Sequence, residues 1–320
     1  MKYNLALDSG GTKVLAILYD EDFNPIKTCR VGSVRENTST KEQIENNINE
    51  LIDRLSLHGL ELGHISGSMD DYLWRKASAD CTVDTVKEYG EMQLGLASAG
   101  IFGYGYLALS GTGVGLMCRC EKGRFGTGGL GAAVSDEGSG YWIGREAAGA
   151  AIRDDELRGE RTMLTDLIAA KYGGTRETFR NALFDIYRQN TISPSTHVAS
   201  LAPLVSQAAY EGDEVAIDIL KRAGKILAER MISVIKKNDL PKNLPMTICG
   251  SAWKGHPIIF ETFSSIMRDF GMEQEVTLPE FEPIAGSIIC HYHEKHGKFD
   301  ESDKLRFKSL YKDYLYNIGK

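Results

Sequence analysis

Three glycine-rich turns, each following a short apolar run, hold the residue types in this 320-residue sequence that could do chemistry. Glycines let successive backbone N–H groups converge on an anionic oxygen, and serine and threonine hydroxyls add further donors. The carboxylate of Asp8, at the start of the first turn, would repel a bound phosphate unless a cation lay between them. Because Mg²⁺ prefers carboxylate, water and phosphate oxygens, the pattern favours a site for phosphate with Mg²⁺. The turns are 8–13 (DSGGTK), 109–113 (LSGTG) and 249–252 (CGSA).

A simpler explanation of the first turn is a plain β-hairpin. Apolar runs at 3–7 and 14–19 flank it, which predicts two strands joined by a glycine turn. Its two glycines would then supply positive φ whether or not a ligand binds. The segment 104–120 repeats this design, and 246–255 adds a third strand followed by a glycine turn. Because one design recurs, we interpret the hairpins as ligand loops.

The remaining periodicity predicts helices around these loops. Apolar residues at helical spacing predict a helix over 41–57, capped by Thr40, and another over 91–99 that ends on Gly100. From His296 on, charged residues with widely spaced apolar positions predict a terminal helix on the surface. Further helices are predicted in the second half at 162–172, 177–187, 197–211 and 213–236.

Length and composition bound the class of protein. A chain of 320 residues favours two domains with a ligand cleft between them. The net charge of −7 argues against a nucleic-acid partner, which would need a basic face. The amino terminus has the pattern of neither a signal peptide nor a membrane span, so we expect a cytoplasmic protein without a membrane partner. The six cysteines lack C-x-x-C spacing and are interpreted as reduced, mostly buried thiols.

Taken in order, the three turns resemble the phosphate 1, phosphate 2 and adenosine motifs of the sugar kinase, Hsp70 and actin superfamily. More narrowly, 128–131 (GGLG) followed by 135–146 (SDEGSGYWIGRE) resembles the signature of the N-acetylglucosamine kinase and BadF/BadG ATPase family. The run 283–287 (PIAGS) matches the closing segment of that family. The resemblance covers about residues 3–292 and leaves only the tail outside it.

This resemblance implies an α/β fold of two ribonuclease-H-like domains, of the actin-like ATPase type, with an ATP cleft between them. Residues 1–115 would form the N-terminal domain, which holds the first phosphate loop and the base. Residues 116–295 would form the C-terminal domain, which holds the sugar and adenosine motifs. Residues 296–320 would form a helical tail that packs back on the surface.

The resemblance also implies a role for each matched residue. The first hairpin would grip the β and γ phosphates of ATP, and Asp8 would hold Mg²⁺ through water. The ATP-binding residues would be Gly10, Gly11, Thr12, Lys13, Ser110, Gly111, Thr112, Gly113, Gly250, Ser251 and Ala252. The sugar-binding residues would be Asn37, Gly128, Gly129, Asp136 and Glu137.

The expected base departs from the pattern of the family. Transfer of a phosphoryl group to a hydroxyl requires a group that accepts the hydroxyl proton. In this family an Asp at a helix start takes that role, and here Glu91 occupies the matching place. Either Glu91 is the base, with a backbone that compensates for its extra methylene, or it is an ordinary acid that the helix dipole stabilises. Leu130, where relatives often carry Trp, and the altered run 66–70 leave the particular sugar open.

The function that the resemblance implies is a kinase that transfers a phosphoryl group from ATP to a hydroxyl of N-acetylglucosamine or a related amino sugar. A homodimer is expected. One alternative is an ATPase that drives a partner protein, as BadF-type activators do. Those activators carry a cysteine-ligated iron–sulfur cluster, for which Cys118 and Cys120 are the remaining candidates. Another alternative is a nucleotide- or sugar-binding sensor that has lost catalysis.

Two other groups of residues are interpreted as structural. His291, His293 and His296 lie close in sequence, but their spacing does not place all three at a regular helical interval for binding a metal. Tyr72 and Trp74 could stack on a sugar, but aromatic side chains at such positions more often pack in a core or on its surface.

Overall fold

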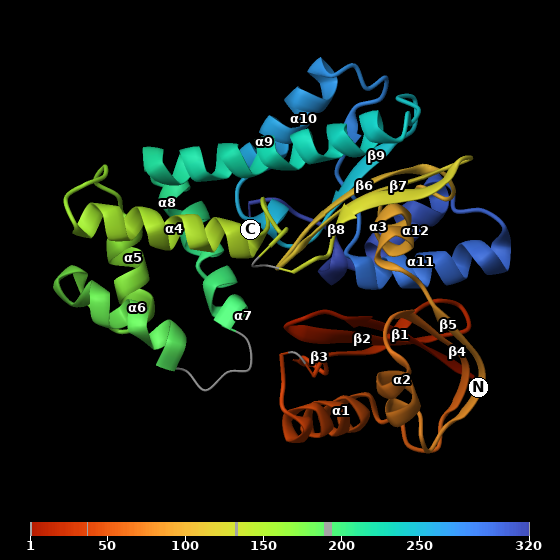
Figure 1. Ribbon diagram of the computed structural model, residues 1–320. Helices are drawn as coiled ribbons and strands as arrows, with labels where there is room; N and C mark the ends of the chain where they lie inside the picture. Colours follow the sequence, from red (N-terminus) through yellow and green to blue (C-terminus); the bar gives the residue numbers. More distant parts are fainter. Residues whose placement is uncertain (1, 37, 132–133, 189–193, 320) are drawn as a thin grey trace. The chain divides into compact units, whose positions relative to one another are not determined.

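The computed structural model describes residues 2–36, 38–131, 134–188 and 194–319 (Figure 1). The chain forms two compact units. Unit 1 comprises Met1–Phe102 and Leu278–Tyr316, and unit 2 comprises Gly103–Thr277 and Asn317–Lys320. These units differ from the predicted boundaries, because a long C-terminal segment returns to the first sheet.

Unit 1 is built on a five-stranded sheet with the order β3-β2-β1-β4-β5. Strand β2 is antiparallel to β1 and to β3, whereas β4 is parallel to β1 and to β5. The β1–β2 pair confirms the first predicted hairpin, and its strands extend slightly beyond the predicted apolar runs. The strands are β1 (Tyr3–Ser9), β2 (Lys13–Asp20), β3 (Pro25–Gly32), β4 (Glu61–Ser68) and β5 (Thr82–Glu88).

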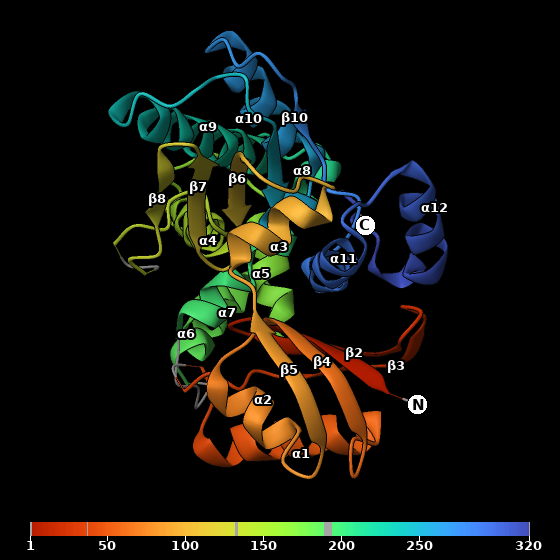
Figure 2. The ribbon, with the colours of Figure 1, turned by 90° about the vertical axis from the view of Figure 1, so that its right-hand side faces the viewer.

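Helices cover both faces of this sheet. Figure 2 shows α1 (Lys41–Leu55) and α2 (Asp71–Ala77) on one face and α11 (Pro283–His296) on the other. The predicted cap is confirmed, since Thr40 and Gln43 form a capping box at the start of α1. On the second face, α3 (Glu91–Ser98) and α12 (Glu301–Leu310) join α11.

Unit 2 repeats this topology in its own five-stranded sheet, ordered β8-β7-β6-β9-β10. Here β7 is antiparallel to β6 and β8, whereas β9 is parallel to β6 and β10. The repeated strand order and pairing confirm the predicted fold class of two α/β units of one design. The strands are β6 (Gly105–Ser110), β7 (Val114–Cys120), β8 (Gly123–Gly128), β9 (Met246–Cys249) and β10 (Val276–Thr277).

The helices of unit 2 mostly follow the predicted periodicity. The predicted helix over 197–211 is wrong as a single element, because Ser200 and Leu201 separate α7 from α8. Pro203 explains the break, since proline is tolerated in a first helical turn but cannot continue a preceding helix. The helices are α4 (Gly140–Asp155), α5 (Leu164–Lys171), α6 (Phe179–Arg188), α7 (Pro194–Ala199), α8 (Ala202–Tyr210), α9 (Glu214–Lys237) and α10 (Pro257–Asp269). Three-residue 3-10 helices lie at Arg176–Thr178, Ala252–Lys254 and, in unit 1, Lys312–Tyr314. No helix in the described part of the chain is long and apolar enough to cross a membrane.

Helix α11 fixes the position of α3 in unit 1. A Cβ at Gly286 would lie only 2.6 Å from Leu94 O and from Ser98 Oγ, so glycine allows the two helices to approach closely. The neighbouring Ser287 hydroxyl lies 2.9 Å from the Ser66 hydroxyl of β4, in a buried hydrogen bond. The segment 283–287 therefore joins α3 to the sheet.

The three histidines near the end of α11 each contact aromatic rings, and His291 and His296 share the ring of Phe23. His291 stacks on His64 at a centroid distance of 4.0 Å, and its Nδ1 lies 2.8 Å from the Tyr19 hydroxyl. Burial, with the neighbouring His64, lowers the pKa of His291 to about 3. His293 stacks on Phe102 and His296 packs against Tyr292.

The C-terminal tail contributes to the core of unit 1. The predicted terminal helix is confirmed as α12, whose Phe307 is fully buried among aromatic rings that include Tyr292 and Tyr311. The Tyr311 hydroxyl donates to Phe23 O at 2.7 Å. Because Leu305 on the same helix is 69% exposed, α12 buries only one of its faces.

We predict that Phe307→Ala lowers the free energy of unfolding of unit 1 by about 3–5 kcal/mol, because it leaves a cavity among packed rings. Leu305→Ala is the matched control and should change that free energy by less than about 0.5 kcal/mol. Urea unfolding of both variants would measure the difference. Equal effects at the two positions would show that the tail is only a surface element.

Candidate active site

The first predicted phosphate loop is the turn of the β1–β2 hairpin. Ser9 and Val14 pair at its base, and Gly10 N donates to Lys13 O at 2.9 Å. Neither Gly10 nor Gly11 has φ in the left-handed region, so the expectation that they supply positive φ is wrong. A Cβ at Gly11 would meet no described atom within 4 Å, and one at Gly10 would only touch Lys13 O at 3.5 Å. The folding of the hairpin therefore gives no reason for glycine at either position.

The second predicted loop, Ser110–Gly113, is held by Gly138 and by Gly140, the first residue of α4. Ser110 Oγ donates to Gly138 O at 2.9 Å, and Gly140 N donates to Gly111 O at 2.8 Å. These bonds hold the loop against the N terminus of α4. Gly111 also avoids the left-handed region, and a Cβ there would meet no described atom within 4 Å.

Asp136, predicted to bind a sugar, turns its carboxylate onto this second loop. It is 6% exposed, and its Oδ1 accepts a long hydrogen bond of 3.4 Å from Val114 N. A Cβ at Gly113 would lie 2.9 Å from Asp136 Oδ2, so the glycine leaves room for the carboxylate. Asp136 supports the loop, and its contact with a sugar stays a prediction. Glu137 is exposed, and its carbonyl accepts from Arg230.

Gly128 and Gly129 shape the end of β8. Their φ values are +106° and +74°, which favour glycine. A Cβ at Gly128 would lie 2.1 Å from Val114 O, and Gly129 N donates to the same carbonyl at 3.0 Å. The backbone therefore requires these glycines, and their predicted contact with a sugar stays a prediction.

The third loop begins at Gly250, directly after β9. Its φ is +105°, and a Cβ there would lie 2.3 Å from Ser110 O. Trp253, in the 3-10 helix that follows, donates from Nε1 to Ala108 O at 3.1 Å. Glycine thus allows the end of β9 to lie against the second loop, and Trp253 anchors the turn on β6.

A cavity of about 240 Å³ in unit 2 brings the second and third loops together. Four of the predicted ATP-binding residues line it: Gly111, Thr112, Ser251 and Ala252. Sequence reasoning missed the other walls, although small residues at helical spacing in 199–206 could have indicated a helix face adjoining a ligand. Those walls include Gly140 and Ile143 of α4, Ala202, Pro203 and Ser206 of α8, Leu220 of α9 and Ile259 of α10.

Asp8 lies near the end of β1, beside the first loop. Burial raises the pKa of its carboxyl to about 6, and the charge of Lys13 opposes the shift. Glu91 and Glu282 also raise this pKa, while Arg35 lowers it. Two other carboxylates and two cations therefore act on the carboxyl of Asp8 at this end of the sheet.

Glu91 begins α3, directly after its N-cap Gly90. Its side chain is exposed, and its charge reaches Asp8. The structure thus places the two residues that were predicted to be catalytic in unit 1, where the charge of Glu91 acts on Asp8. Glu282, the residue before Pro283 of α11, was missed, because nothing in the sequence indicates that α11 packs beside α3.

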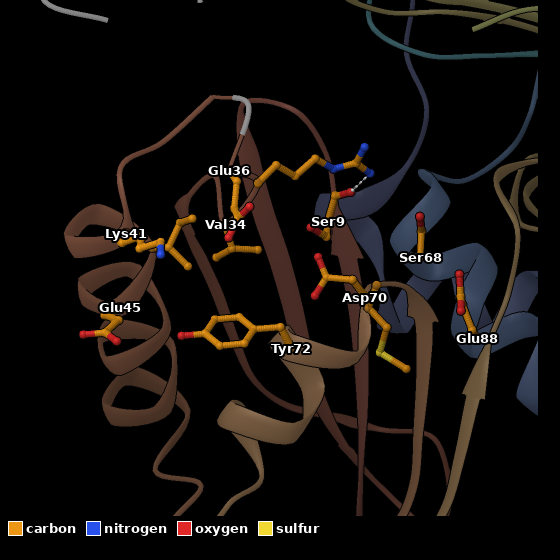
Figure 3. Close-up of a pocket in the computed structure, with 12 residues that line it drawn as sticks. Ser9, Val34, Glu36, Lys41, Glu45, Ser68, Asp70, Tyr72 and Glu88 are labelled. Atoms are coloured by element: carbon orange, nitrogen blue, oxygen red, sulfur yellow. Dashed lines mark hydrogen bonds between the residues drawn. The ribbon is translucent and has the colours of Figure 1, made fainter. Parts of the chain in front are cut away.

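Unit 1 also contains a pocket of about 760 Å³, which Ser9 at the end of β1 helps to line (Figure 3). It lies between the loop after β3, the first turn of α1 and the start of α2. Tyr72 lines this pocket, whereas Trp74 donates to Asp71 and packs under Arg75. Sequence reasoning missed most of the lining, which comprises Ser9, Val34, Arg35, Glu36, Lys41, Ile44, Glu45, Ser68, Met69, Asp70, Tyr72 and Glu88.

Asn37, predicted to bind a sugar, lies outside the described residues. Its neighbours Arg35 and Glu36 line the pocket of unit 1. One wall of the pocket is formed by Ser68, Met69 and Asp70. These residues belong to the run 66–70, whose departure from the family pattern could have indicated a wall of the pocket.

Comparison with known proteins yields relatives along most of the chain. The sequence model of the BadF/BadG/BcrA/BcrD ATPase family matches residues 105–288. A Clostridium acetobutylicum protein named N-acetylmuramic acid/N-acetylglucosamine kinase is 28% identical over 287 residues, which cover 84% of this chain and 91% of the relative.

Solved structures share the fold at lower sequence identity. A Porphyromonas gingivalis protein described as a candidate N-acetylglucosamine kinase aligns with a TM-score of 0.67 and 18% identity, over 92% of this chain and 99% of its own. A ROK-family glucokinase from Streptomyces griseus, solved with glucose and AMPPNP, aligns with a TM-score of 0.53 and 17% identity. That alignment covers 90% of this chain and 97% of the glucokinase. Since the family match spans more than half of the residues and includes the second and third glycine loops, the chain belongs to the BadF/BadG/BcrA/BcrD ATPase family.

Proposed function

We propose that this protein is an ATP-dependent kinase that transfers the γ-phosphoryl group, with Mg²⁺, to a hydroxyl of N-acetylglucosamine or a related amino sugar. The observation that carries the proposal concerns Gly10, Gly11 and Gly111. Neither their backbone conformation nor the packing of described residues requires glycine there. The N–H groups of Gly10 and Gly111 donate to Lys13 O and Gly113 O within their turns, and the absence of side chains lets a ligand approach the rest of each turn closely. Phosphate oxygens suit such loops.

Each unit, taken by itself, carries residues that we assign to the nucleotide. Gly10, Gly11, Thr12 and Lys13 of unit 1 would bind the terminal phosphates. In unit 2, Ser110–Gly113 would bind phosphate, and the 240 Å³ cavity would hold adenosine between the second and third loops. Gly250 supports this assignment, because it lets Ser251 and Ala252 lie beside the second loop.

Asp8 fits the binding of Mg²⁺ through water. Its carboxylate lies at the base of the first loop, and burial, with two other carboxylates, raises its pKa, so a bound cation would stabilise its charged form. Within the described ranges, no three or more His, Cys, Asp or Glu side chains form a group that could hold a metal ion. Water and phosphate oxygens would therefore complete the coordination, as Mg²⁺ commonly prefers. When bound, Mg²⁺ neutralises the charge that develops on the phosphates.

Glu91 is the proposed base. Its exposed carboxylate begins α3 near Asp8, where it would accept the proton of the attacking hydroxyl. The other explanation is that Glu91 is an ordinary acid in the first turn of α3, which the helix dipole stabilises and which has no catalytic role. Only the consequence of substitution separates the two explanations.

An amino sugar as acceptor is supported by the names of the curated relatives. One is the Clostridium kinase, and another is an N-acetyl-D-glucosamine kinase of Dictyostelium discoideum, 27% identical over 60% of this chain. We assign Asn37, Gly128, Gly129, Asp136 and Glu137 to the sugar on the resemblance alone. The predicted homodimer and cytoplasmic location stay predictions.

No specific observation favours an ATPase that drives a partner protein. Its iron–sulfur cluster would need accessible thiolates, but Cys118 and Cys120 are at most 5% exposed. Burial raises the pKa of Cys118 to about 12, which disfavours the thiolate form that binds iron.

We predict that Gly11→Ala and Gly111→Ala each weaken Mg·ATP binding by at least about tenfold, because a methyl group would block the approach of phosphate. Neither variant should change the urea midpoint of unfolding appreciably, since each new Cβ meets no described atom. Calorimetric titration with Mg·AMPPNP would measure the affinity. Normal affinity in both variants would contradict the assignment of these loops to phosphate.

We predict that Glu91→Gln abolishes sugar-dependent release of ADP from Mg·ATP, with a loss in kcat of about 10²- to 10⁴-fold. The control is Glu301→Gln, which removes an exposed acid from the first turn of α12 and should leave kcat unchanged. N-acetylglucosamine, glucosamine and related sugars would be tested as acceptors. If ATP binds but no sugar raises turnover of the wild type, the kinase proposal fails, and a partner-driven ATPase or a sensor takes its place.

A further inference from the structure

Arg35 is a partly buried cation that lacks an acidic partner among the described residues. Its Nη2 donates to Ser9 O at 2.7 Å, the hydrogen bond drawn in Figure 3. Within the described part of the chain, this is the one hydrogen bond of the guanidinium, and it forms no ion pair there. A guanidinium carries five N–H donors in a planar fork that matches phosphate and carboxylate oxygens. The remaining donors are therefore available to an anionic ligand.

The loop that carries Arg35 is locked by its own hydrogen bonds. Arg35 N donates to Ser33 Oγ at 3.2 Å, and Arg35 O accepts from the backbone N–H groups of Thr38 and Ser39, both at 3.0 Å. The Ser33 and Thr38 hydroxyls lie 2.8 Å apart, and Asn47 Nδ2 of α1 donates to Ser33 O at 2.8 Å. These bonds restrict the backbone, and the hydrogen bond to Ser9 O restricts the side chain, so both lower the conformational entropy that would be lost on binding a ligand.

This loop rests on the first phosphate loop. Ser9, the acceptor of the Arg35 hydrogen bond, directly precedes Gly10, and Ser33 Oγ lies 3.4 Å from Gly10 O. The positive charge of Arg35 also lowers the pKa of Asp8. The guanidinium is thus fixed where the proposed function places the terminal phosphate and the Mg²⁺-binding carboxylate.

Resting on the proposed kinase function, we propose that Arg35 is a catalytic residue that binds the γ-phosphoryl group during its transfer. The bond from the γ-phosphorus to the leaving oxygen of ADP breaks, and that oxygen keeps the electron pair. A bond from the acceptor hydroxyl oxygen to the γ-phosphorus forms, and the hydroxyl proton passes to Glu91. Arg35 undergoes no covalent change; its N–H groups donate to phosphoryl oxygens, whose charge they stabilise.

A carboxylate on the acceptor sugar is the other anion that Arg35 could bind, since Arg35 lines the 760 Å³ pocket. The geometry favours the phosphoryl group, because Arg35 is tied to the residue before Gly10. Lys41, in the first turn of α1, is a second cation of this pocket, and Figure 3 places it on the wall away from Ser9. A carboxylate reaching the α1 wall would meet Lys41.

The test compares Arg35→Gln and Arg35→Lys with the control Arg54→Gln. Arg54 is an exposed arginine of α1 that pairs with Glu50 and lies outside the pocket lining. The kcat and KM of each variant would be measured with N-acetylglucosamine, which is uncharged, and with N-acetylmuramic acid, which carries a carboxylate. Calorimetry would give the affinities for Mg·AMPPNP and Mg·ADP without relying on activity.

We expect Arg35→Gln to lower kcat by about 10²- to 10³-fold with every sugar that the wild type phosphorylates. Its affinity for Mg·AMPPNP should fall by about tenfold, while that for Mg·ADP should stay within about twofold. Arg35→Lys should recover part of kcat, because it restores the charge without the fork. Arg54→Gln should match the wild type in every measurement.

Three results would overturn this role of Arg35. They are unchanged kinetics, a loss confined to the KM of the carboxylate-bearing sugar, and equal weakening of Mg·AMPPNP and Mg·ADP binding. Arg35→Lys serves the same comparison if Arg35→Gln does not fold. If the wild type phosphorylates no sugar, the proposed function fails, and the two nucleotide affinities alone decide whether Arg35 contacts the terminal phosphate.

Discussion

The carboxylate of Asp8 is the charge around which the site of unit 1 is arranged. Burial raises its pKa to about 6, and Glu91 and Glu282 add to that effect. Lys13 from the hairpin and Arg35 from the loop after β3 oppose it. Near neutral pH the fold therefore holds a charged carboxylate where its own burial and two other acids disfavour the charge, which lowers the stability of the empty protein. A bound cation with phosphate would remove that penalty, since a ligand that binds only the folded state stabilises it.

The architecture assembles this charge cluster from distant parts of the chain. Strand β1 carries Asp8, α3 carries Glu91, and Glu282 lies at the start of α11, far along the sequence. Gly286 lets α11 approach the backbone of α3, and Ser287 ties α11 to Ser66 of β4. A wider side chain at position 286 would push α3 away from the sheet and move Glu91 relative to Asp8. The segment 283–287 thus helps to set the geometry of a site in which Asp8, Arg35 and Glu91 come from the first hundred residues.

The sequence predicts the hairpins and most helices, because apolar spacing and glycine turns are local signals. It could not assign α11 and α12 to unit 1, since an apolar helix face does not reveal which sheet will cover it. The reason given for Gly10 was wrong, because φ depends on the turn that the flanking strands impose. The sequence did not indicate that the carboxylate of Asp136 lies against Gly113, and its contact with a sugar stays a prediction. Arg35 was missed because a single charged residue in a loop has no periodicity, and its role depends on where the loop folds back.

Urea unfolding of the wild type and Asp8→Asn at pH 4.5 and pH 7.5, without nucleotide or Mg²⁺, tests the central claim most directly. The pKa of Asp8 is raised from 3.8 to about 6 in the folded state, so the folded protein binds more protons than the unfolded chain between these values. Its stability is therefore highest at low pH and is lost as the pH rises through about 6. We predict that Asp8→Asn is more stable than the wild type at pH 7.5, by about 1–3 kcal/mol, and that this advantage falls to about a third at pH 4.5. If the two proteins were equally stable at pH 7.5, or if the advantage of Asp8→Asn did not depend on pH, the charged carboxylate of Asp8 would not destabilise the folded protein, and the account would be contradicted.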